Sequence, residues 1–333
     1  MSVGRSNPWH ARQVTIHGPA DGWVVAPDGR KFWGKAGAAG LLCVDGGGAD
    51  GGGVGGGQVG GGQVGGGGAD GQGRSGGARI LLQHRVEWSH FGGTWGIPGG
   101  ARQFDESAVD GALRESAEEA AVPSDSLRLL FTSVVDLGIW SYTTVAARAI
   151  TPFEPVISDR ESEALEWVPV DRVDELPLHP GFAASWPRLR PLLAAPLQLV
   201  VDSANVVGSR PDGWWRDRAG ATDRLTASLV RLAADGVPAA ALGETDASID
   251  TWWPDITLVV EGQAKRAQEP AAGTRVRLLP AETDGDSAIV RHVAEIVGSA
   301  RTVVVTADRA LAERASALGA TVVGPRALLE LLD

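Results

Sequence analysis

The chain has 333 residues, of which 43% are hydrophobic and 21% charged, values typical of folded globular protein with room for two domains. Its net charge of -11 argues against broad, non-specific nucleic-acid binding, which relies on Lys and Arg to neutralise phosphates. The single cysteine, Cys43, rules out an intrachain disulfide and predicts a cytoplasmic protein with a buried thiol. The N-terminus lacks a signal-peptide pattern, and no window approaches the roughly 20 apolar residues of a membrane span.

The most conspicuous segment is residues 46–77, where 20 of 32 residues are glycine and a GGQV unit recurs. Such a segment has high backbone entropy and little to bury, so it is predicted to be disordered. It is either a functional linker or an expanded loop tip, and the loop is favoured because closure entropy grows slowly with length. Residues 39–45 and 78–85 on either side have strand patterns. The segment is therefore predicted to be an insertion in a hairpin of one domain.

A helical pattern follows the next turn-rich stretch. Apolar residues recur every three or four positions over residues 108–120, and Asp105 is the predicted N-cap. Glu115, Glu118 and Glu119 stand at i, i+3 and i+4, so they share one face of this helix. Three carboxylates on one face repel each other unless a hard divalent cation binds them. Glutamates on a helix are otherwise an ordinary solvent-exposed face. The surrounding residues therefore decide whether these three form a metal site or such a face.

Those surroundings have a specific register: a glycine, five residues, a glutamate, seven residues, and then Arg-Glu-x-x-Glu-Glu. The residues that fill it are Gly100, Glu106, Arg114, Glu115, Glu118 and Glu119. The register resembles the box of the Nudix hydrolase family, G-x5-E-x7-R-E-U-x-E-E-x-G-U, in which U is aliphatic. Ser116 and Ala121 depart from the pattern at an aliphatic and a glycine position, but neither change removes a carboxylate.

The resemblance implies a Nudix α/β/α sandwich with a mixed sheet over residues 34–192, which hydrolyses a nucleoside diphosphate linked to another moiety. Carried over by position, the box would bind Mg2+ or Mn2+, and an activated water would attack phosphorus. The implied ligands are Glu115, Glu118, Glu119 and the carbonyl oxygen of Gly99, and the implied accessory pair is Arg114 and Glu106.

Residues outside the box are further candidates for the same site. Glu163 is one for the additional acidic group that such enzymes recruit, although an ordinary surface glutamate explains it equally well. Trp95, Trp140 and Tyr142 are candidates for stacking on a base, and packing in or beside the core is the alternative for each. The segment 179–186 is predicted to be structural.

Beyond a proline-rich stretch that ends near residue 196, strands and helices alternate, which predicts a parallel sheet with covering helices over residues 197–333. The predicted strands are 197–201, 256–260, 275–279, 302–306 and 321–323. The predicted helices are 222–234, 287–297, 311–318 and 325–332. Residues 1–33 would form an N-terminal extension.

Polar and acidic side chains follow several of these strands, and groups at the carboxyl ends of parallel strands converge on one crevice. They predict a second Mg2+ or Mn2+ site, suited to phosphodiester hydrolysis. The candidates are Asp202, Asn205, Glu261, Asp286 and Asp308. Each alone is explained by turn chemistry or a helix N-cap. Together their order is similar to that in NYN/PIN-like nuclease domains, which implies a Rossmann-like parallel α/β fold.

The segment Trp214–Arg218 offers aromatic and basic side chains, either for single-stranded RNA or as a hydrophobic lid with solvated arginines. The sequence as a whole predicts a Nudix pyrophosphohydrolase fused to an NYN/PIN-like domain, acting on a nucleotide-type small molecule. Three rivals stay open. In the first, the Nudix half is a nucleotide sensor without turnover. In the second, the later half is a ribonuclease, and the Nudix half senses a nucleotide or processes RNA ends for it. In the third, both halves form an interaction scaffold without activity.

Overall fold

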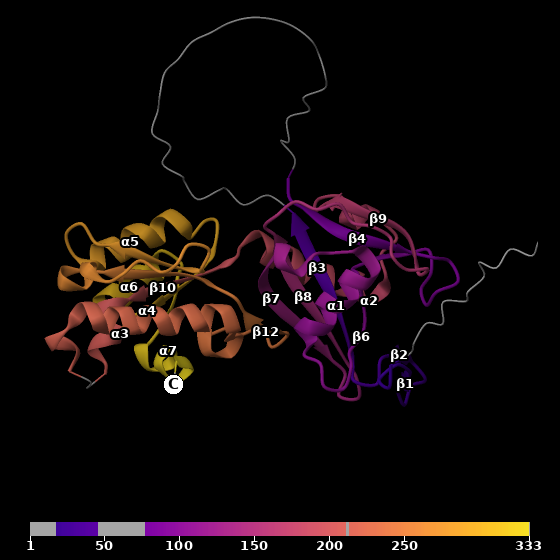
Figure 1. The fold of residues 1–333 in the computed structure, drawn as a ribbon, viewed down its shortest axis with the longest axis horizontal. Helices are drawn as coiled ribbons and strands as arrows, with labels where there is room; N and C mark the ends of the chain where they lie inside the picture. The colour runs from indigo at the N-terminus through magenta and orange to yellow at the C-terminus, as the bar shows by residue number, and fades with distance from the viewer. Residues whose placement is uncertain (1–17, 46–76, 211–212, 333) are drawn as a thin grey trace, which may run out of the picture.

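The computed structural model describes residues 18–45, 77–210 and 213–332. The glycine-rich segment predicted to be disordered lies outside these ranges except for Gly77. Two sheets lie next to each other along the long axis of the molecule (Figure 1). Within the described ranges, no helix has both the length and the apolar character that crossing a membrane requires.

The first sheet is mixed and has nine strands in the order β11-β12-β7-β8-β3-β4-β5, with β6 on β3 and β9 on β4. The strands are β3 (Ala38–Asp45), β4 (Arg79–Arg85), β5 (Trp95–Gly96), β6 (Gly99–Ala101), β7 (Leu127–Asp136), β8 (Ser141–Ala149), β9 (Ser162–Pro169), β11 (Val237–Pro238) and β12 (Ile249–Trp252). β3 pairs parallel with β8 and antiparallel with β4, which confirms the hairpin predicted around the glycine-rich segment. A separate hairpin joins β1 (Trp23–Val25) and β2 (Lys31–Trp33).

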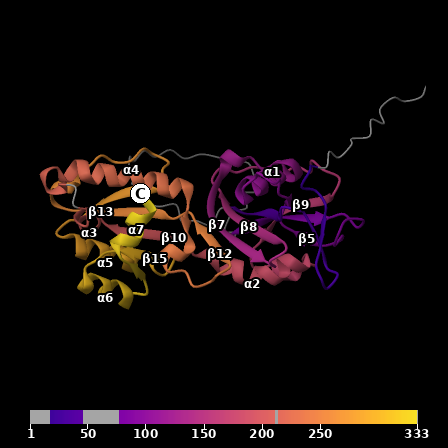
Figure 2. The ribbon, with the colours of Figure 1, turned by 90° about the horizontal axis from the view of Figure 1, so that it is seen from below.

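Two helices cover this sheet from opposite sides, α1 (Ala108–Ala120) and α2 (Pro180–Ala194), as Figure 2 shows. Beneath α1 lie small and branched apolar side chains, including Leu41 and Leu81. On the opposite face, Trp186 of α2 is almost fully buried against the sheet. The predicted α/β/α sandwich is therefore confirmed. Cys43 is buried in β3, and burial raises the pKa of its thiol to about 12, so the predicted structural thiol is confirmed.

The start of α1 differs from the sequence prediction. Ser107, not Asp105, is the N-cap, because its backbone is extended and its hydroxyl oxygen accepts the Asp110 N–H at 3.0 Å. Asp105 lies two residues earlier, in the turn before the helix. The prediction of Asp105 was wrong because either polar residue can cap a helix, and the local backbone decides which one does.

The end of α1 lies at the off-pattern Ala121. This residue adopts the left-handed conformation (φ 52°, ψ 34°), and its N–H donates to the carbonyl oxygens of Ser116 and Ala117. The helix thus ends with glycine-type geometry although the residue carries a Cβ. Ser116, the other off-pattern residue, is fully buried, and its hydroxyl donates to the Leu113 carbonyl at 3.0 Å.

Replacing Ala121 by Gly is expected to raise the free energy of unfolding by about 1 kcal/mol, because the left-handed region is strained for an alanine and free for a glycine. Urea denaturation measures the change. The matched control is Ala117→Gly, an exposed interior position of the same helix, where glycine is expected to cost about 1 kcal/mol. Destabilisation by both substitutions would contradict this account of the helix end.

The second sheet is parallel throughout, with the order β14-β13-β10-β15-β16. Its strands are β10 (Leu197–Asp202), β13 (Asp255–Val260), β14 (Val276–Pro280), β15 (Arg301–Val305) and β16 (Thr321–Val323). The helices α3 (Ser203–Gly208), α4 (Arg218–Asp235) and α7 (Pro325–Leu332) pack on one face, and α5 (Gly285–Ile296) and α6 (Arg309–Ala317) on the other. The predicted parallel α/β fold is confirmed, with element ends shifted by a few residues.

The two sheets are joined more closely than the sequence suggests. After α4 the chain returns to the first sheet, where β12 pairs antiparallel with β7 and places Trp252 opposite Phe131. The rings of these two residues lie 5.2 Å apart within one continuous apolar core. Arg275 donates to the carbonyl oxygens of Leu129 and Trp253, which ties the start of β14 to β7. The division into residues 34–192 and 197–333 stays a prediction, and residues 237–252 of the later half belong to the earlier sheet.

Candidate active site

Arg114 lies at the centre of the box residues on α1. Its guanidinium donates two hydrogen bonds to Glu106, at 2.8 and 2.9 Å. It also contacts Glu115 at 2.7 Å and Glu118 at 3.3 Å. These hydrogen bonds hold the pKa of the Glu106 carboxyl below its usual range. The structure therefore brings the predicted accessory pair together, and that pair braces the helix against the preceding turn.

Glu119 is the most deeply buried of the three helix glutamates, with 9% of its surface exposed. Its carboxylate accepts the Gly99 N–H at 2.9 Å. Burial, and then the charge of Glu115, raise the pKa of Glu119 well above its usual value. Within the described part of the chain, Glu119 has no ion pair with a basic side chain. The pKa of Glu115 is also raised by burial, although its ion pair with Arg114 opposes that shift.

The short strand β6, which precedes α1, comes unusually close to these carboxylates and to β3. A Cβ at Gly100 would lie 2.6 Å from a carboxylate oxygen of Glu115, and one at Gly99 would lie 2.4 Å from the backbone of β3. The box glycines therefore let a backbone strand approach the acidic face. Closely spaced carboxylate oxygens are the kind of ligand that Mg2+ and Mn2+ prefer.

The chemistry of this donor set fits a divalent cation. As the side chains stand, no three Asp, Glu, His or Cys residues in the described ranges are grouped as ligands of one ion. On α1, Glu115 and Glu118 form ion pairs with Arg114 instead of pointing together toward Glu119. The side chain of Glu118 is also 62% exposed to solvent. A shift of these two side chains toward the buried Glu119 would be needed to complete the donor set.

An acidic residue that the sequence did not single out lies beside Glu119. The negative charge of Asp159 contributes to the raised pKa of Glu119, and the adjoining Ser158 N–H donates to the Glu119 carbonyl at 3.1 Å. Asp159 is held by Ser162, whose hydroxyl donates to it at 2.6 Å and accepts from the Gln83 amide at 2.7 Å. The side-chain amide oxygen of Gln83 is buried without a hydrogen-bond partner.

Glu163, the sequence candidate for an additional acid, lies elsewhere. Its carboxylate is 3.1 Å from Nδ1 of His84, and 59% of its side chain is exposed. In the structure Glu163 therefore pairs with His84, and its role as the additional acid stays a prediction. No local sequence pattern distinguishes Asp159 from Glu163, because Asp159 approaches Glu119 through the loop after β8, whose Ser158 N–H donates to the Glu119 carbonyl.

The three aromatic residues proposed for base stacking are largely covered by their own neighbours. Trp140 stacks on Phe32 with ring centroids 4.7 Å apart and donates to the Trp33 carbonyl. Trp95 packs over the ring of His84 at 4.8 Å. Tyr142 is buried enough that desolvation raises the pKa of its hydroxyl. Each is partly buried and packs on its own neighbours, and stacking on a base stays a prediction for all three.

A basic residue that the sequence analysis missed lies near the glutamates. Arg85, at the end of β4, donates to the His90 carbonyl at 3.2 Å, and its charge lowers the pKa of both Glu119 and Tyr142. Burial and the same arginine lower the pKa of His179 to about 4, so its ring is neutral near pH 7. Neutral Nδ1 accepts the Gly181 N–H and caps α2, as the predicted structural role requires.

The acidic candidates of the second sheet gather at the carboxyl ends of its strands. Asp202 is 6% exposed and accepts hydrogen bonds from Asn205 at 2.6 Å and from Thr306 at 2.9 Å. Burial, and then the charges of Asp308 and Asp202, raise the pKa of Asp286. Asp308 also caps α6, as its structural alternative predicted. The N-cap of α5 is Asp284, so the same alternative is wrong for Asp286.

The last candidate of that group, Glu261, lies beside the start of α5. Its carboxylate accepts the Gly285 N–H at 2.8 Å. Glu261 thus interacts with the start of the neighbouring helix, while the charges of Asp202 and Asp308 act on Asp286. Among the described residues no three of these acids are grouped as ligands of one ion, so the second metal site stays a prediction.

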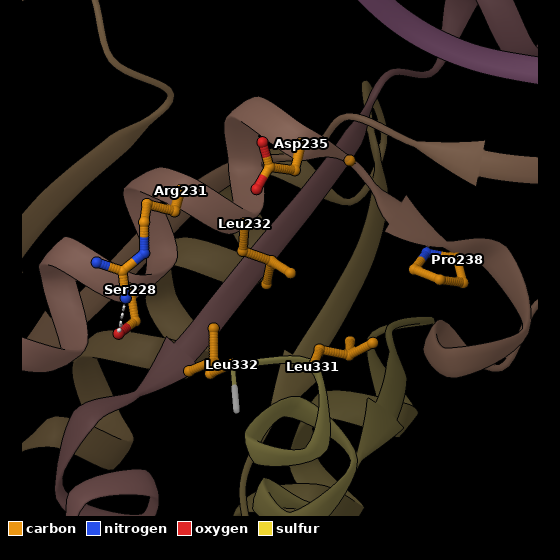
Figure 3. A pocket seen from close by; sticks show the side chains of 8 residues that line it. Ser228, Arg231, Leu232, Asp235, Pro238, Leu331 and Leu332 are labelled. Atoms are coloured by element: carbon orange, nitrogen blue, oxygen red, sulfur yellow. Dashed lines mark hydrogen bonds between the residues drawn. The ribbon is translucent and has the colours of Figure 1, made fainter. Parts of the chain in front are cut away.

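A cavity of about 270 Å3 lies apart from both acidic groups, between the end of α4 and the C-terminal helix. Figure 3 shows Leu232, Leu331 and Leu332 on its walls, with Arg231 hydrogen-bonded to Ser228 at its edge. None of the candidate site residues lines it. The candidate chemistry therefore lies on the strand ends and on α1, not in this cavity.

Comparisons with known proteins agree with the first site. A profile of the NUDIX domain matches residues 70–189. A protein named putative 8-oxo-dGTP diphosphatase 3, from Mycobacterium tuberculosis, is 42% identical over 189 residues, which cover 55% of this chain and 74% of that protein. A nucleoside triphosphate pyrophosphatase/Nudix hydrolase fusion protein from Bifidobacterium longum is 37% identical over 175 residues, covering 52% of this chain and 31% of that protein.

Among solved structures, a Nudix hydrolase from M. smegmatis, RenU, is 41% identical, with a TM-score of 0.42, covering 52% of this chain and 95% of that one. The M. tuberculosis relative is matched over 74% of its own length. The chain therefore belongs to the Nudix family and is a hydrolase that acts on pyrophosphate bonds.

Proposed function

We propose that the chain hydrolyses a nucleoside diphosphate linked to another moiety, using Mg2+ or Mn2+ held by Glu115, Glu118 and Glu119. The observation that carries this proposal is the buried carboxylate of Glu119 beside the partly buried carboxylate of Glu115, both next to Gly99 and Gly100 of β6. Two like charges that share a buried site call for a cation. The names of the mycobacterial and bifidobacterial relatives support a nucleotide as substrate.

The protein's own groups have distinct roles in this proposal. A bound divalent ion would polarise a phosphoryl oxygen and lower the pKa of a water molecule. Arg114, fixed by Glu106, orients Glu115 and Glu118 on their shared face. The Gly99 N–H fixes one oxygen of Glu119 and leaves the other oxygen for a ligand. Asp159, which lies beside Glu119, is the candidate that accepts a proton from the attacking water.

A panel of substrates tests the proposed function. It would contain nucleoside triphosphates with ordinary and oxidised bases, nucleotide sugars and dinucleoside polyphosphates, each with Mg2+, with Mn2+ and with chelator. Cleavage of at least one class, with a nucleoside monophosphate among the products, is expected only when metal is present. A protein that binds Mn2+ but releases no product from any member of the panel would instead be a sensor or a scaffold.

Asp159→Asn is expected to lower kcat by about 10- to 100-fold, because it removes a carboxylate that lies beside the metal glutamates. The matched control is Glu163→Gln, which removes an exposed carboxylate paired with His84 and is expected to change kcat by less than about twofold. Steady-state kinetics and Mn2+ titration calorimetry measure both variants. The opposite order of effects would restore Glu163 as the additional acid.

We further propose that residues 197–333 form an NYN/PIN-like unit with a second metal site, appended to the Nudix unit of residues 34–192. The observation that favours it is the convergence of Asp202, Asp286 and Asp308 at the carboxyl ends of a parallel sheet. An exposed Trp215, 56% accessible, lies in the aromatic segment that the sequence singled out for RNA.

Asp202→Asn tests that second activity. If the unit is a nuclease, cleavage of single-stranded RNA by the wild type is expected to require Mn2+ or Mg2+. It should survive Glu119→Gln and disappear in Asp202→Asn. RNA that stays intact with the wild-type protein and both metals would remove the nuclease proposal and leave the pyrophosphohydrolase proposal untouched.

A further inference from the structure

Phe91 has a strained backbone although its side chain is not buried in the core. Among the described residues, two non-glycine residues have positive φ, Phe91 (57°) and Ala121 (52°). Ala121 ends a helix, where this conformation is common. Phe91 lies in the loop between β4 and β5, and a bulky residue with positive φ costs free energy there. Such strain persists where the surrounding structure imposes it, and it is concentrated at functional sites.

The loop that imposes this strain is tied down on both sides of Phe91. The Thr94 hydroxyl donates to the Phe91 carbonyl at 2.6 Å. The N–H groups of Gly92 and Gly93 donate to the carbonyl oxygens of Ser89 and Arg85, both at 2.9 Å. A Cβ at Gly92 would lie 2.3 Å from a backbone oxygen. The loop is therefore fixed by its own hydrogen bonds, and it holds the Phe91 side chain in a defined place.

The ring of Phe91 is nevertheless poorly packed. It is 44% exposed, so the strain is not offset by burial in the core. Its aromatic neighbours are His90, with centroids 4.2 Å apart and planes at 66°, and His179, at 4.8 Å and 82°. Both contacts are edge-to-face. The described structure therefore places no aromatic ring parallel to Phe91, whereas Trp140 is already stacked on Phe32.

Two series of contacts connect Phe91 to Glu119. His179, which contacts the Phe91 ring, donates its N–H to the Trp95 carbonyl, and the chain runs from there to Gly99, which binds Glu119. Arg85 donates to the carbonyl of His90, the residue before Phe91, and its charge acts on Glu119. Arg85, which also pairs with Glu161 at 3.5 Å, thus connects the loop that carries the exposed Phe91 ring to the surroundings of Glu119.

We propose that Phe91 is a stacking platform for the aromatic base of the nucleotide whose pyrophosphate binds at the box glutamates. This inference rests on the proposed pyrophosphohydrolase function and adds the residue that reads the base. Every base has a π-face, so a ring of this kind increases affinity for nucleotides over base-free phosphates. Arg85 supplies positive charge near the phosphates that lie between the two sites.

The test compares Phe91→Gly, Phe91→Asn and Phe91→Trp. Glycine and asparagine accept positive φ and remove the ring, whereas tryptophan keeps an aromatic surface. For the first two variants KM for the nucleotide is expected to rise about 5- to 100-fold with kcat nearly unchanged, and Phe91→Trp is expected to keep a low KM. Calorimetry without divalent metal should show the same loss in nucleoside monophosphate binding.

Base-free binding and a second exposed aromatic provide the controls. The inhibition constant of inorganic pyrophosphate should be the same in the wild type and in Phe91→Gly. Trp88→Ala removes a 70% exposed ring from the same loop and should leave KM unchanged. The melting temperature of Phe91→Gly should equal or exceed that of the wild type, because the substitution relieves strain.

Two results would overturn the inference. An unchanged nucleotide KM in both ring-deletion variants would mean that the base does not stack on Phe91. An equal loss of pyrophosphate affinity would mean that the loop only shapes the phosphate site. Either result leaves the proposed function standing, provided that the wild type cleaves a nucleotide in a metal-dependent way. A wild type that cleaves none would count against the proposed function instead.

Discussion

Replacing Glu119 by Gln is expected to lower metal-dependent kcat/KM by more than about 100-fold, because it removes the charge of a carboxylate that we propose as a metal ligand. Glutamine has nearly the same shape and can still accept the Gly99 N–H through its carbonyl oxygen. The charge that is lost is a buried one whose pKa is already raised by desolvation. The fold is therefore expected to be kept, with a melting temperature equal to or above that of the wild type.

Kinetics with the best substrate of the panel, together with Mn2+ titration calorimetry, measure the effect. Glu118→Gln is expected to act in the same direction, and its exposed side chain makes structural damage less of a concern. Glu166→Gln, an exposed glutamate on β9, is the matched control and should leave both measurements unchanged. Full activity in the Glu118→Gln, Glu119→Gln double variant would rule out the box as the metal site.

The parts of this structure that the sequence predicts are those governed by local spacing. The glutamates at i, i+3 and i+4 must share a helix face wherever that helix packs, and the Arg114–Glu106 pair follows from the same register. The strands of the second sheet are short apolar runs separated by amphipathic helices, a pattern that leaves few topologies open. These features are fixed by periodicity and need no knowledge of distant residues.

The parts that the sequence does not predict depend on contacts between distant residues. Asp159 reaches Glu119 because a loop after β8 returns to the end of α1, and nothing in the local pattern favours it over Glu163. The backbone strain at Phe91 arises from the hydrogen bonds of its loop, so no sequence pattern predicts it. β12 has four residues, too few for a reliable alternation, and its partner is more than 100 residues earlier.

The second large expected effect concerns Trp252, the last residue of β12. Trp252→Ala is expected to lower the free energy of unfolding by about 3–5 kcal/mol, because the side chain is 1% exposed and its removal leaves a large cavity. Trp252 packs against Phe131 of β7 and beneath the guanidinium of Arg301, at 5.2 and 5.5 Å. It therefore connects the sheet that carries the Nudix box to the parallel sheet that follows.

The position of Trp252 makes the expected unfolding behaviour specific. Because one apolar core runs through both sheets, the wild type should unfold in a single transition by calorimetry. Trp252→Ala should lower the midpoint by roughly 10 °C and separate the transition into two, since each half keeps most of its own core. Nucleotide hydrolysis should be lost at the lower of the two midpoints if the box half is the less stable one.

Trp215→Ala is the matched control, because it removes an exposed tryptophan from the same half of the chain and is expected to cost less than about 0.5 kcal/mol. Two separate transitions in the wild type, unaffected by Trp252→Ala, would show that β12 adds to the first sheet without coupling the halves. A single transition that Trp252→Ala divides would mean that the later half stabilises the pyrophosphohydrolase by completing its sheet. In that case, shortening the chain to residues 34–192 would remove a strand of the catalytic unit itself.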